Sequence, residues 1–179
     1  MGSDAEIARR GVLRTFEWID GDAVFTPVFH DPEVLASLGP GLAEPFRDAG
    51  VTAVVAPEAR GLVLGALCAV ALGVGFVAAR KPGFPRAGDR VEVTSAPDWQ
   101  GRRIAFTVAR VFDSRDRILL VDDWIETGSQ ATAIASAIDE MGAALAGTSV
   151  IVDQAPDPVR SALGVVGLLR HDQLPPSQT

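Results

Sequence analysis

The chain contains a single cysteine, Cys68, no tyrosine, and fewer basic than acidic residues. One cysteine excludes an internal disulfide. Its place in an apolar run predicts a buried free thiol in a reducing cytoplasm, with a catalytic thiol as the disfavoured alternative. The net charge of −7 argues against a general binder of nucleic acid or of membrane surfaces, but a locally positive pocket for a small anion remains compatible with it. The N-terminus carries Asp4 and Glu6 and no apolar signal core, so we expect no secretion.

The chain has only one long uncharged stretch, from Gly61 to Ala79, and four glycines interrupt it. These glycines favour a buried helix over Leu62–Leu72, a turn at Gly73–Gly75 and a buried strand ending at Arg80. A membrane span is the alternative that the same stretch leaves open. The chain has 179 residues, 47% of them hydrophobic, and no low-complexity tract, which suits one globular domain over residues 1–179.

The apolar runs alternate with helical stretches, and each run is continuous rather than alternating in polarity. Strands buried on both faces belong to parallel sheets covered by helices, so we expect an α/β fold with a parallel sheet flanked by helices. Asp31 and Pro32 form a helix start, as N-cap and first-turn residue. The expected strands are Thr52–Ala56, Gly75–Ala79, Arg117–Val121, Thr148–Val152 and, at an edge, Val165–Leu169; the expected helices are Pro32–Arg47, Leu62–Leu72 and Ser129–Met141.

Two segments interrupt this alternation. Residues 12–30 carry two short strand-like pieces around the turn Asp20–Asp22 and form a small N-terminal hood. Residues 81–109 begin with a Pro/Gly-rich stretch, contain a hairpin and are expected to form a flexible lid loop. Residues 171–179 form a tail, and no linker divides the domain.

The most informative motif runs from Ile118 to Ala131, where an apolar strand leads to adjacent carboxylates, Asp122 and Asp123, and then to a short loop before a helix. Ligands of open parallel sheets bind at this end of the strands. The loop Glu126–Gln130 offers backbone N–H groups, two hydroxyls and a helix N-terminus, which suit a phosphate. Carboxylates can accept hydrogen bonds from sugar hydroxyls, and the neighbouring amides can bind a phosphate, so the combination indicates a sugar phosphate as ligand. The alternative is an ordinary acidic strand end followed by a helix N-cap.

This motif resembles the phosphoribosylpyrophosphate signature of the type I phosphoribosyltransferases. The resemblance implies that Asp122 and Asp123 engage the ribose 2- and 3-hydroxyls. It also implies that the following loop holds the 5-phosphate through Glu126, Thr127, Gly128, Ser129 and Gln130.

A second match, Val54–Gly61 followed by Gly75–Pro85, resembles the adenine phosphoribosyltransferases. By that resemblance, the pyrophosphate loop consists of Glu58, Ala59, Arg60 and Gly61, with Arg80 and Lys81 nearby. A pyrophosphate leaving group needs cations where its negative charge develops. Arg60 could bind it through two parallel N–H groups, whereas Lys81 would act as a point charge. For the Arg80–Lys81 pair alone, a solvated strand end is the alternative.

A third match, Asp22–Leu35, resembles the hood of the same family, which holds adenine through backbone groups and stacks an aromatic ring on it. Val24, Phe25 and Thr26 occupy the matching positions. The family has arginine where Thr26 stands, so the identity of the base is open, and a core role for Phe25 is the alternative.

The lid departs from the family, whose loop carries tyrosines and a glutamate that assists proton transfer. By the resemblance, Asp98 takes the position of that glutamate and Trp99 the position of a tyrosine. The alternative for Asp98 is a solvent-exposed acid in a loop. In the phosphate loop, Gln130 replaces a hydroxyl or small residue, and Glu126 adds negative charge.

The resemblance implies transfer of 5-phosphoribosyl to a purine base, adenine favoured, in purine salvage. It also implies a cytoplasmic homodimer and a hydrated Mg²⁺ held by substrate oxygens rather than by a protein cage. One alternative is an acceptor such as hypoxanthine, xanthine or a modified purine. Another is a sensor that binds phosphoribosylpyrophosphate or a nucleotide without turnover. A generic dinucleotide-binding fold is least favoured, since no G-x-G-x-x-G follows an expected strand.

Overall fold

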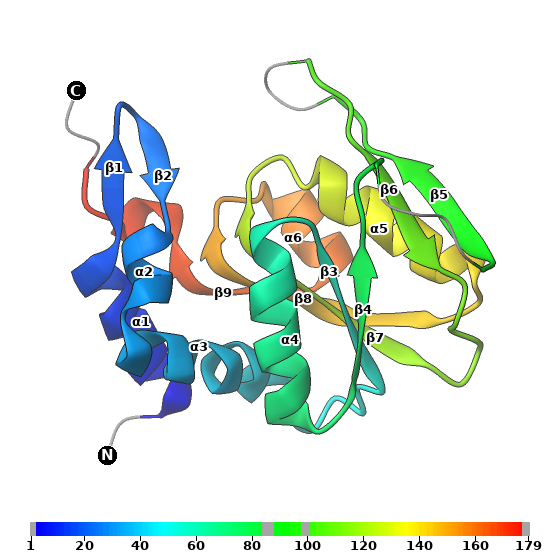
Figure 1. The fold of residues 1–179 in the computed structure, drawn as a ribbon, viewed down its shortest axis with the longest axis horizontal. Helices are drawn as coiled ribbons and strands as arrows, with labels where there is room; N and C mark the ends of the chain where they lie inside the picture. The colour runs from blue at the N-terminus through cyan, green and yellow to red at the C-terminus, as the bar shows by residue number, and fades with distance from the viewer. Residues whose placement is uncertain (1–2, 84–87, 98–100, 177–179) are drawn as a thin grey trace.

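The computed structural model describes residues 3–83, 88–97 and 101–176. A five-stranded sheet with the order β4-β3-β7-β8-β9 lies at its centre, and every neighbouring pair is parallel (Figure 1). This arrangement confirms the expected α/β fold with a parallel sheet. The strands are β3 (Ala53–Pro57), β4 (Gly75–Ala79), β7 (Arg117–Ile125), β8 (Ala144–Asp153) and β9 (Val165–Arg170).

Each apolar run predicted as a strand lies in one of these strands, and β9 is the predicted edge strand. β7 is longer than predicted, because it stays paired with β8 through Asp122, Trp124 and Ile125. The acid pair lies at the C-terminal end of the strand, as predicted, but the strand does not stop at Val121: Asp122 and Asp123 lie within β7, ahead of its last two residues.

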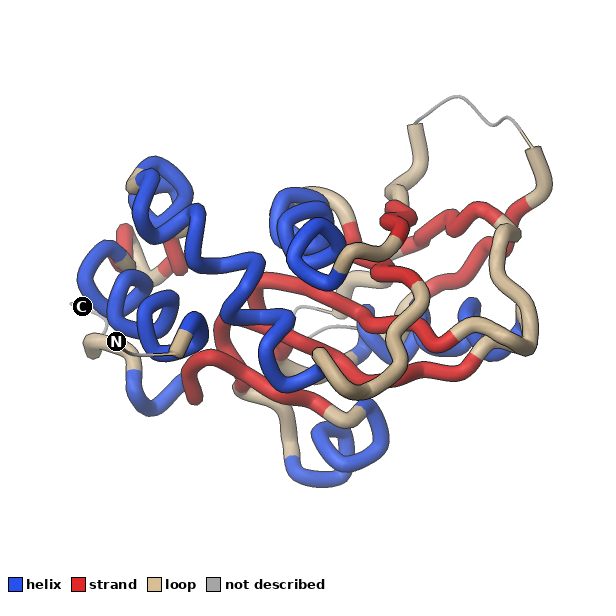
Figure 2. Tube along the Cα trace, turned by 90° about the horizontal axis from the view of Figure 1, so that it is seen from below, coloured by secondary structure: helices blue, strands red, loops and turns tan. Residues whose placement is uncertain are grey.

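Helices cover both faces of the sheet (Figure 2). On one face, α3 (Pro32–Ala43) and α4 (Arg60–Leu72) pack against apolar residues of β3, β7 and β8. On the other face, α5 (Ser129–Glu140) and α6 (Asp157–Leu163) provide the cover. The central strands are thereby buried on both sides, which is why their runs Ala53–Pro57, 118–121 and 150–152 are apolar.

The start of α3 confirms the predicted cap, since Asp31 accepts hydrogen bonds from the backbone N–H groups of Glu33 and Val34, at 3.0 and 3.1 Å. The end differs from the prediction of one helix to Arg47. The α-helix stops at Ala43 and a short 3₁₀ turn, η1 (Glu44–Phe46), follows. Pro45 has no backbone N–H to donate to the preceding turn, which accounts for the change.

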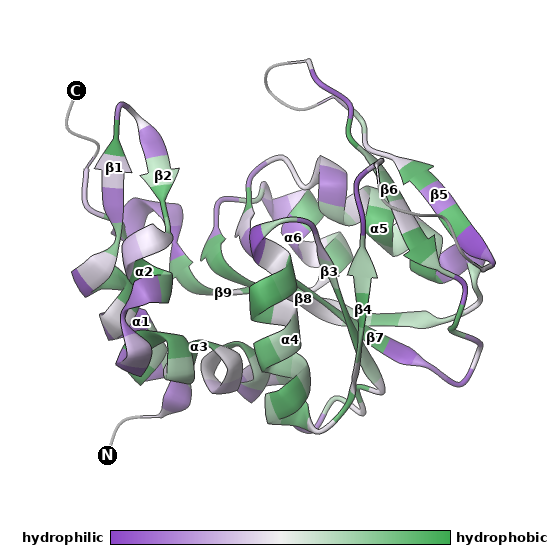
Figure 3. Cartoon of the chain, viewed as in Figure 1, coloured by the Kyte–Doolittle hydropathy of each residue, from purple (hydrophilic) through white to green (hydrophobic). Residues whose placement is uncertain are grey.

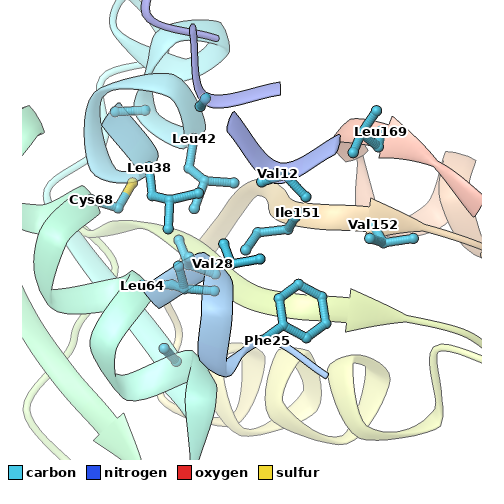
Figure 4. Packing of buried hydrophobic residues seen from close by; sticks show 14 of the residues in the cluster. Val12, Phe25, Val28, Leu38, Leu42, Leu64, Cys68, Ile151, Val152 and Leu169 are labelled. Atoms are coloured by element: carbon cyan, nitrogen blue, oxygen red, sulfur yellow. The ribbon is translucent and has the colours of Figure 1, made fainter. Parts of the chain in front are cut away.

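The long uncharged stretch folds as predicted into α4, a turn and β4. Gly73 ends α4 in the left-handed conformation at φ 71°, a backbone angle that favours glycine. Leu64 and Cys68 of α4 are fully buried in the core, where they lie near Leu38 and Ile151 (Figure 4). Burial raises the pKa of Cys68 to about 12, which confirms a buried thiol and opposes a catalytic one. Across the described ranges, no helix has the length and hydropathy that a membrane span requires.

The N-terminal hood contains the predicted pair of strands, β1 (Glu17–Ile19) and β2 (Asp22–Val24), and then α2 (Thr26–His30). It also contains a helix that the sequence did not reveal, α1 (Asp4–Thr15). The buried residues of α1 are Ala8, Gly11 and Val12, too few for a clear apolar period. Near the C-terminus, η2 (His171–Gln173) lies beside the hood, and Nε1 of Trp18 donates to the carbonyl of Pro175 at 2.7 Å.

The predicted hairpin of the lid region is formed by β5 (Arg90–Thr94) and β6 (Ala105–Ala109). Its base is anchored to the sheet edge, because Arg80 and Thr107 exchange two backbone hydrogen bonds of 2.9 and 2.8 Å. Phe106 and Val108 of β6 pack with Ile134, Ala137 and Ile138 of α5 on that face of the sheet. Asp98 and Trp99, to which the loop roles were assigned, lie outside the described residues.

Candidate active site

A pocket of about 430 Å³ opens at the carboxyl ends of β3 and β7 and at the start of α5. The sheet places it there, since neighbouring parallel strands end at the same edge and their connecting loops lie side by side. Many of the predicted site residues line this pocket: Glu58, Ala59, Arg60, Lys81, Asp122, Asp123, Glu126, Thr127, Gly128, Ser129 and Gln130.

The two carboxylates of β7 have different partners because successive side chains of a strand point in different directions. Asp123 is 6% exposed, and its Oδ2 lies 2.7 Å from Nε of Arg60. The contact lacks hydrogen-bond alignment, and this buried oxygen has no hydrogen-bond partner among the described residues. Asp122 accepts a hydrogen bond of 2.8 Å from the backbone N–H of Asp123 through Oδ1. Asp123 therefore has an acceptor suited to a ligand hydroxyl.

The pKa of Asp122 is raised well above its ordinary value. Burial is the main cause, and the adjacent charge of Asp123 adds to it. Two carboxylates held this closely in a partly closed pocket favour a ligand that brings donors or positive charge.

The loop after β3 places its residues by contacts with β4. The backbone N–H of Glu58 donates to the carbonyl of Ala79 at 3.0 Å, and Oε2 of Glu58 accepts from the backbone N–H of Lys81 at 3.2 Å. The peptide bond between Glu58 and Ala59 is cis. These contacts hold Lys81 at the pocket, whereas Arg80 pairs with Thr107 through its backbone and is not among the lining residues.

Gly61, the second residue of α4, lies directly against the acid pair. A Cβ added there would lie 2.9 Å from Oδ1 of Asp122 and 3.0 Å from Cδ of Pro57. Asp122 therefore occupies the space that a larger residue at position 61 would need.

Replacing Gly61 by alanine is expected to displace the Asp122 carboxylate and to lower the kcat/KM of a reaction in this pocket by about 10-fold or more, since small misplacements at reacting groups are costly. Gly75→Ala is the matched control, because a Cβ at Gly75 meets nothing within 4 Å. Steady-state kinetics of both variants measure the effect. Equal activity of the two variants would contradict this account of Gly61.

Helix α5 begins at Ser129, as predicted, so the last two residues of the predicted phosphate loop, Ser129 and Gln130, form its first turn. Gly128 precedes it at φ 75°, and a Cβ there would lie 2.3 Å from Cγ1 of Val159, so only glycine fits. The backbone N–H of Ser129 donates to Oγ1 of Thr127 at 3.3 Å, which keeps both hydroxyls at the helix N-terminus. Glu126 is exposed at the pocket rim.

The predicted base-binding residues of the hood, Val24, Phe25 and Thr26, are not among the residues that line the pocket. Phe25 is 1% exposed, and its ring is packed edge-on against Trp124 with centroids 6.4 Å apart. Cζ of Arg60 lies over the same ring, 5.2 Å from its centroid. The alternative of a core position for Phe25 thus describes this structure, and its stacking on a base stays a prediction.

Several lining residues were not assigned to the site from the sequence, among them Arg102, Trp124, Thr148 and Val150. Arg102 reaches the pocket from the lid hairpin, and Thr148 and Val150 come from β8. Trp124 follows the acid pair directly, and its Nε1 donates to Oε1 of Gln154 at 2.9 Å. Trp124 had a sequence signal, its place inside the motif, which also contains the lining residues Leu120, Ile125 and Ala131. His171, in the tail, lies half-buried with its ring 5.6 Å from that of Trp124.

Comparisons with known proteins agree with this geometry, although no family model matches the chain. A xanthine phosphoribosyltransferase of Lactobacillus delbrueckii subsp. bulgaricus is 34% identical over 70% of this chain and 67% of its own length. An adenine phosphoribosyltransferase of Nocardioides sp. is 36% identical over 80% of this chain and 78% of its own. The adenine phosphoribosyltransferase of Trypanosoma brucei, solved with AMP, pyrophosphate and ribose-5-phosphate, shares the fold with a TM-score of 0.82 at 22% identity, over 94% of this chain and 81% of that one.

The chain therefore belongs to the type I phosphoribosyltransferase family. Within this family it is similar to the adenine phosphoribosyltransferases, which confirms the resemblance that its motifs indicated.

Proposed function

We propose that the protein transfers the 5-phosphoribosyl group of phosphoribosylpyrophosphate to a purine base, giving a nucleoside monophosphate and pyrophosphate in purine salvage. The observation that carries this proposal is the position of Asp122 and Asp123. Both line one pocket with the loop Glu58–Arg60 on one side and the N-terminus of α5 on the other. Hydroxyl acceptors between two anion-binding elements suit a sugar that is phosphorylated at both ends.

In the reaction, a base nitrogen forms a bond to C1 of the ribose while the bond from C1 to the pyrophosphate oxygen breaks. Pyrophosphate leaves with the electron pair, and the nitrogen loses its proton. Positive charge develops at C1 and negative charge on the leaving group. Arg60 and Lys81 are placed to stabilise the leaving group, and Asp122 and Asp123 to orient the ribose. The assignment of proton transfer to Asp98 remains a prediction.

Mg²⁺ belongs to the same proposal. Among the described residues, no group of three or more histidine, cysteine, aspartate or glutamate side chains is arranged to hold a metal ion. The pocket lining includes four carboxylates, those of Glu58, Asp122, Asp123 and Glu126, which would repel a polyanion. These residues fit a hydrated Mg²⁺ that arrives on the oxygens of the substrate and neutralises part of its charge.

Adenine is the favoured acceptor, since relatives named adenine phosphoribosyltransferase cover most of the chain. The second candidate is xanthine, which is favoured by the similarity to a xanthine phosphoribosyltransferase. The exposed Thr26 in the hood, where the family resemblance implies arginine, keeps this choice open.

The test is incubation of the protein with phosphoribosylpyrophosphate, Mg²⁺ and a mixture of purine and pyrimidine bases, followed by chromatography. Loss of adenine with formation of AMP is the expected result, and loss of xanthine instead would reassign the acceptor. No turnover with any base, together with a higher melting temperature in phosphoribosylpyrophosphate, would replace the enzyme by a sensor.

A cytoplasmic homodimer also forms part of the proposal. Helix α4 has no charged residue after Arg60 and is hydrophobic along its length (Figure 3). Its outer face exposes Val63 by 45% and Val70 by 81%, beside the sheet-edge strand β4. Exposed apolar side chains on one face of a helix suit a protein partner, here a second copy.

Light scattering after size exclusion is expected to give about twice the chain mass of 18.8 kDa. Val70→Glu, which puts a charge on this face, is expected to shift the protein to the monomer, whereas Val111→Glu, at an exposed position outside α4, serves as the control. A monomeric wild type, or a dimer that survives Val70→Glu, would contradict this interface.

A further inference from the structure

Arg60 makes three contacts that join the pyrophosphate loop to the hood and to β7. Its Nε lies 2.7 Å from Oδ2 of Asp123, and its NH1 group donates a long hydrogen bond of 3.5 Å to the carbonyl of Ala23. Its Cζ lies 5.2 Å from the centroid of the Phe25 ring, within cation–π range. The guanidinium of Arg60 thus contacts the carboxylate of Asp123 and also covers one face of the Phe25 ring.

These two contacts cover groups that the proposed reaction needs for other purposes. Asp123 is needed for a ribose hydroxyl, and the face of Phe25 is needed for the purine. Phe25 is 1% exposed, and its other ring neighbours are Phe16, Phe29 and Trp124. While Arg60 stays in place, a purine cannot stack on the face that the guanidinium covers.

A pyrophosphate group competes for Arg60 on favourable terms. It offers several anionic oxygens to a planar guanidinium fork, whereas Asp123 offers one oxygen without hydrogen-bond alignment. The Arg60 side chain is 49% exposed, so it can turn toward a ligand in the pocket without crossing packed core. Its departure would free Oδ2 of Asp123 for a donor and uncover Phe25.

We propose that Arg60 covers the purine-stacking face of Phe25 until a pyrophosphate group draws it away, so that purine binding depends on pyrophosphate. This inference rests on the proposed function and assigns Arg60 a second role besides binding the leaving group. Pyrophosphate and purine then bind with positive coupling through one side chain. A purine that arrives first meets a closed site.

The test is calorimetric titration of the protein with the base that it turns over in the mixed-base assay, in the presence and absence of inorganic pyrophosphate and Mg²⁺. In the wild type, pyrophosphate is expected to lower the Kd of the base by about 10-fold or more, within the usual range of coupling between sites. In Arg60→Gln, the base is expected to bind tightly without pyrophosphate, and the Kd to change by less than about 2-fold on its addition. Arg60→Lys, which keeps the charge but loses the fork, is expected to fall between them.

Arg115→Gln is the matched control, because Arg115 is an exposed arginine that pairs with Asp113. It precedes β7, at the opposite end of that strand from the pocket. It should behave as the wild type does. Equal Kd values for the wild type with and without pyrophosphate, alongside normal turnover, would overturn the inference and leave the proposed function standing. Persistent coupling in Arg60→Gln would overturn it as well. Absence of turnover with every base would remove the proposed function, and this inference with it.

Discussion

Replacing both Asp122 and Asp123 by asparagine is expected to lower kcat/KM by about 10²- to 10⁴-fold. Each change removes a charge-assisted hydrogen bond to the ribose, which contributes roughly 1.5–3 kcal/mol, and the two effects act on one sugar. Steady-state kinetics with phosphoribosylpyrophosphate and the accepted base measure the loss. Full turnover by the double variant would contradict the central assignment.

The double variant should stay folded, and the single variant Asp122→Asn should have a higher melting temperature than the wild type. Because burial raises the pKa of Asp122, ionising this group costs folding free energy. The advantage of the variant should be absent below the ordinary pKa of 3.8 and grow as the pH rises toward the raised pKa of the folded state. Each kcal/mol gained corresponds to about 2–4 °C in a domain of this size. Thermal unfolding across this pH range checks the trend, and a wild type more stable than the variant at neutral pH would contradict it.

Replacing Asp153 by alanine is expected to cost about 2–4 kcal/mol of stability, and to lower the melting temperature by roughly 5–15 °C. Asp153 ends β8, is 3% exposed, and accepts hydrogen bonds from Arg160 at 2.6 Å and Arg170 at 2.8 Å. Its removal leaves Arg160, whose side chain is 21% exposed, without its main carboxylate partner. It also loosens Gln154, to which Trp124 donates. Thermal or urea unfolding measures the loss.

Asp157→Ala is the control for this prediction, since Asp157 pairs with the same arginine but its side chain is 94% exposed. Burial pushes the pKa of Asp153 up, but the hydrogen bonds from Arg160 and Ala155 and the two arginine charges outweigh burial and lower it. The stabilisation by Asp153 should therefore be complete above pH 3.8 and fade as the pH falls toward the lowered value. Similar losses for Asp157→Ala and Asp153→Ala would contradict this account.

The parallel sheet was predictable because its strands are apolar on both faces, a pattern that few other arrangements give. The end of β7 was not predictable from that pattern, since polar residues interrupt it. Asp122 and Asp123 remain in the strand only because β8 continues beside them. Helix α1 was missed for a related reason, because the residues that it buries, Ala8, Gly11 and Val12, are few and small, and Gly11 lies against Val34.

The candidate site was predictable where it consists of contiguous motifs, as at Glu58–Arg60 and Glu126–Gln130. It was not predictable where it depends on side chains from distant segments. Arg102 enters the pocket from the lid hairpin. The position of Arg60 over Phe25 joins residues 35 apart in the sequence, and no local pattern specifies such a contact.

The most direct test of the account is ³¹P NMR of phosphoribosylpyrophosphate and Mg²⁺ with the wild-type protein, before and after addition of the accepted base. The account predicts that free pyrophosphate and a nucleoside 5-phosphate appear together at equal rates, only after the base is added, and not with the Asp122→Asn, Asp123→Asn protein. Release of pyrophosphate without a nucleotide product, or equal rates for the two proteins, would contradict it.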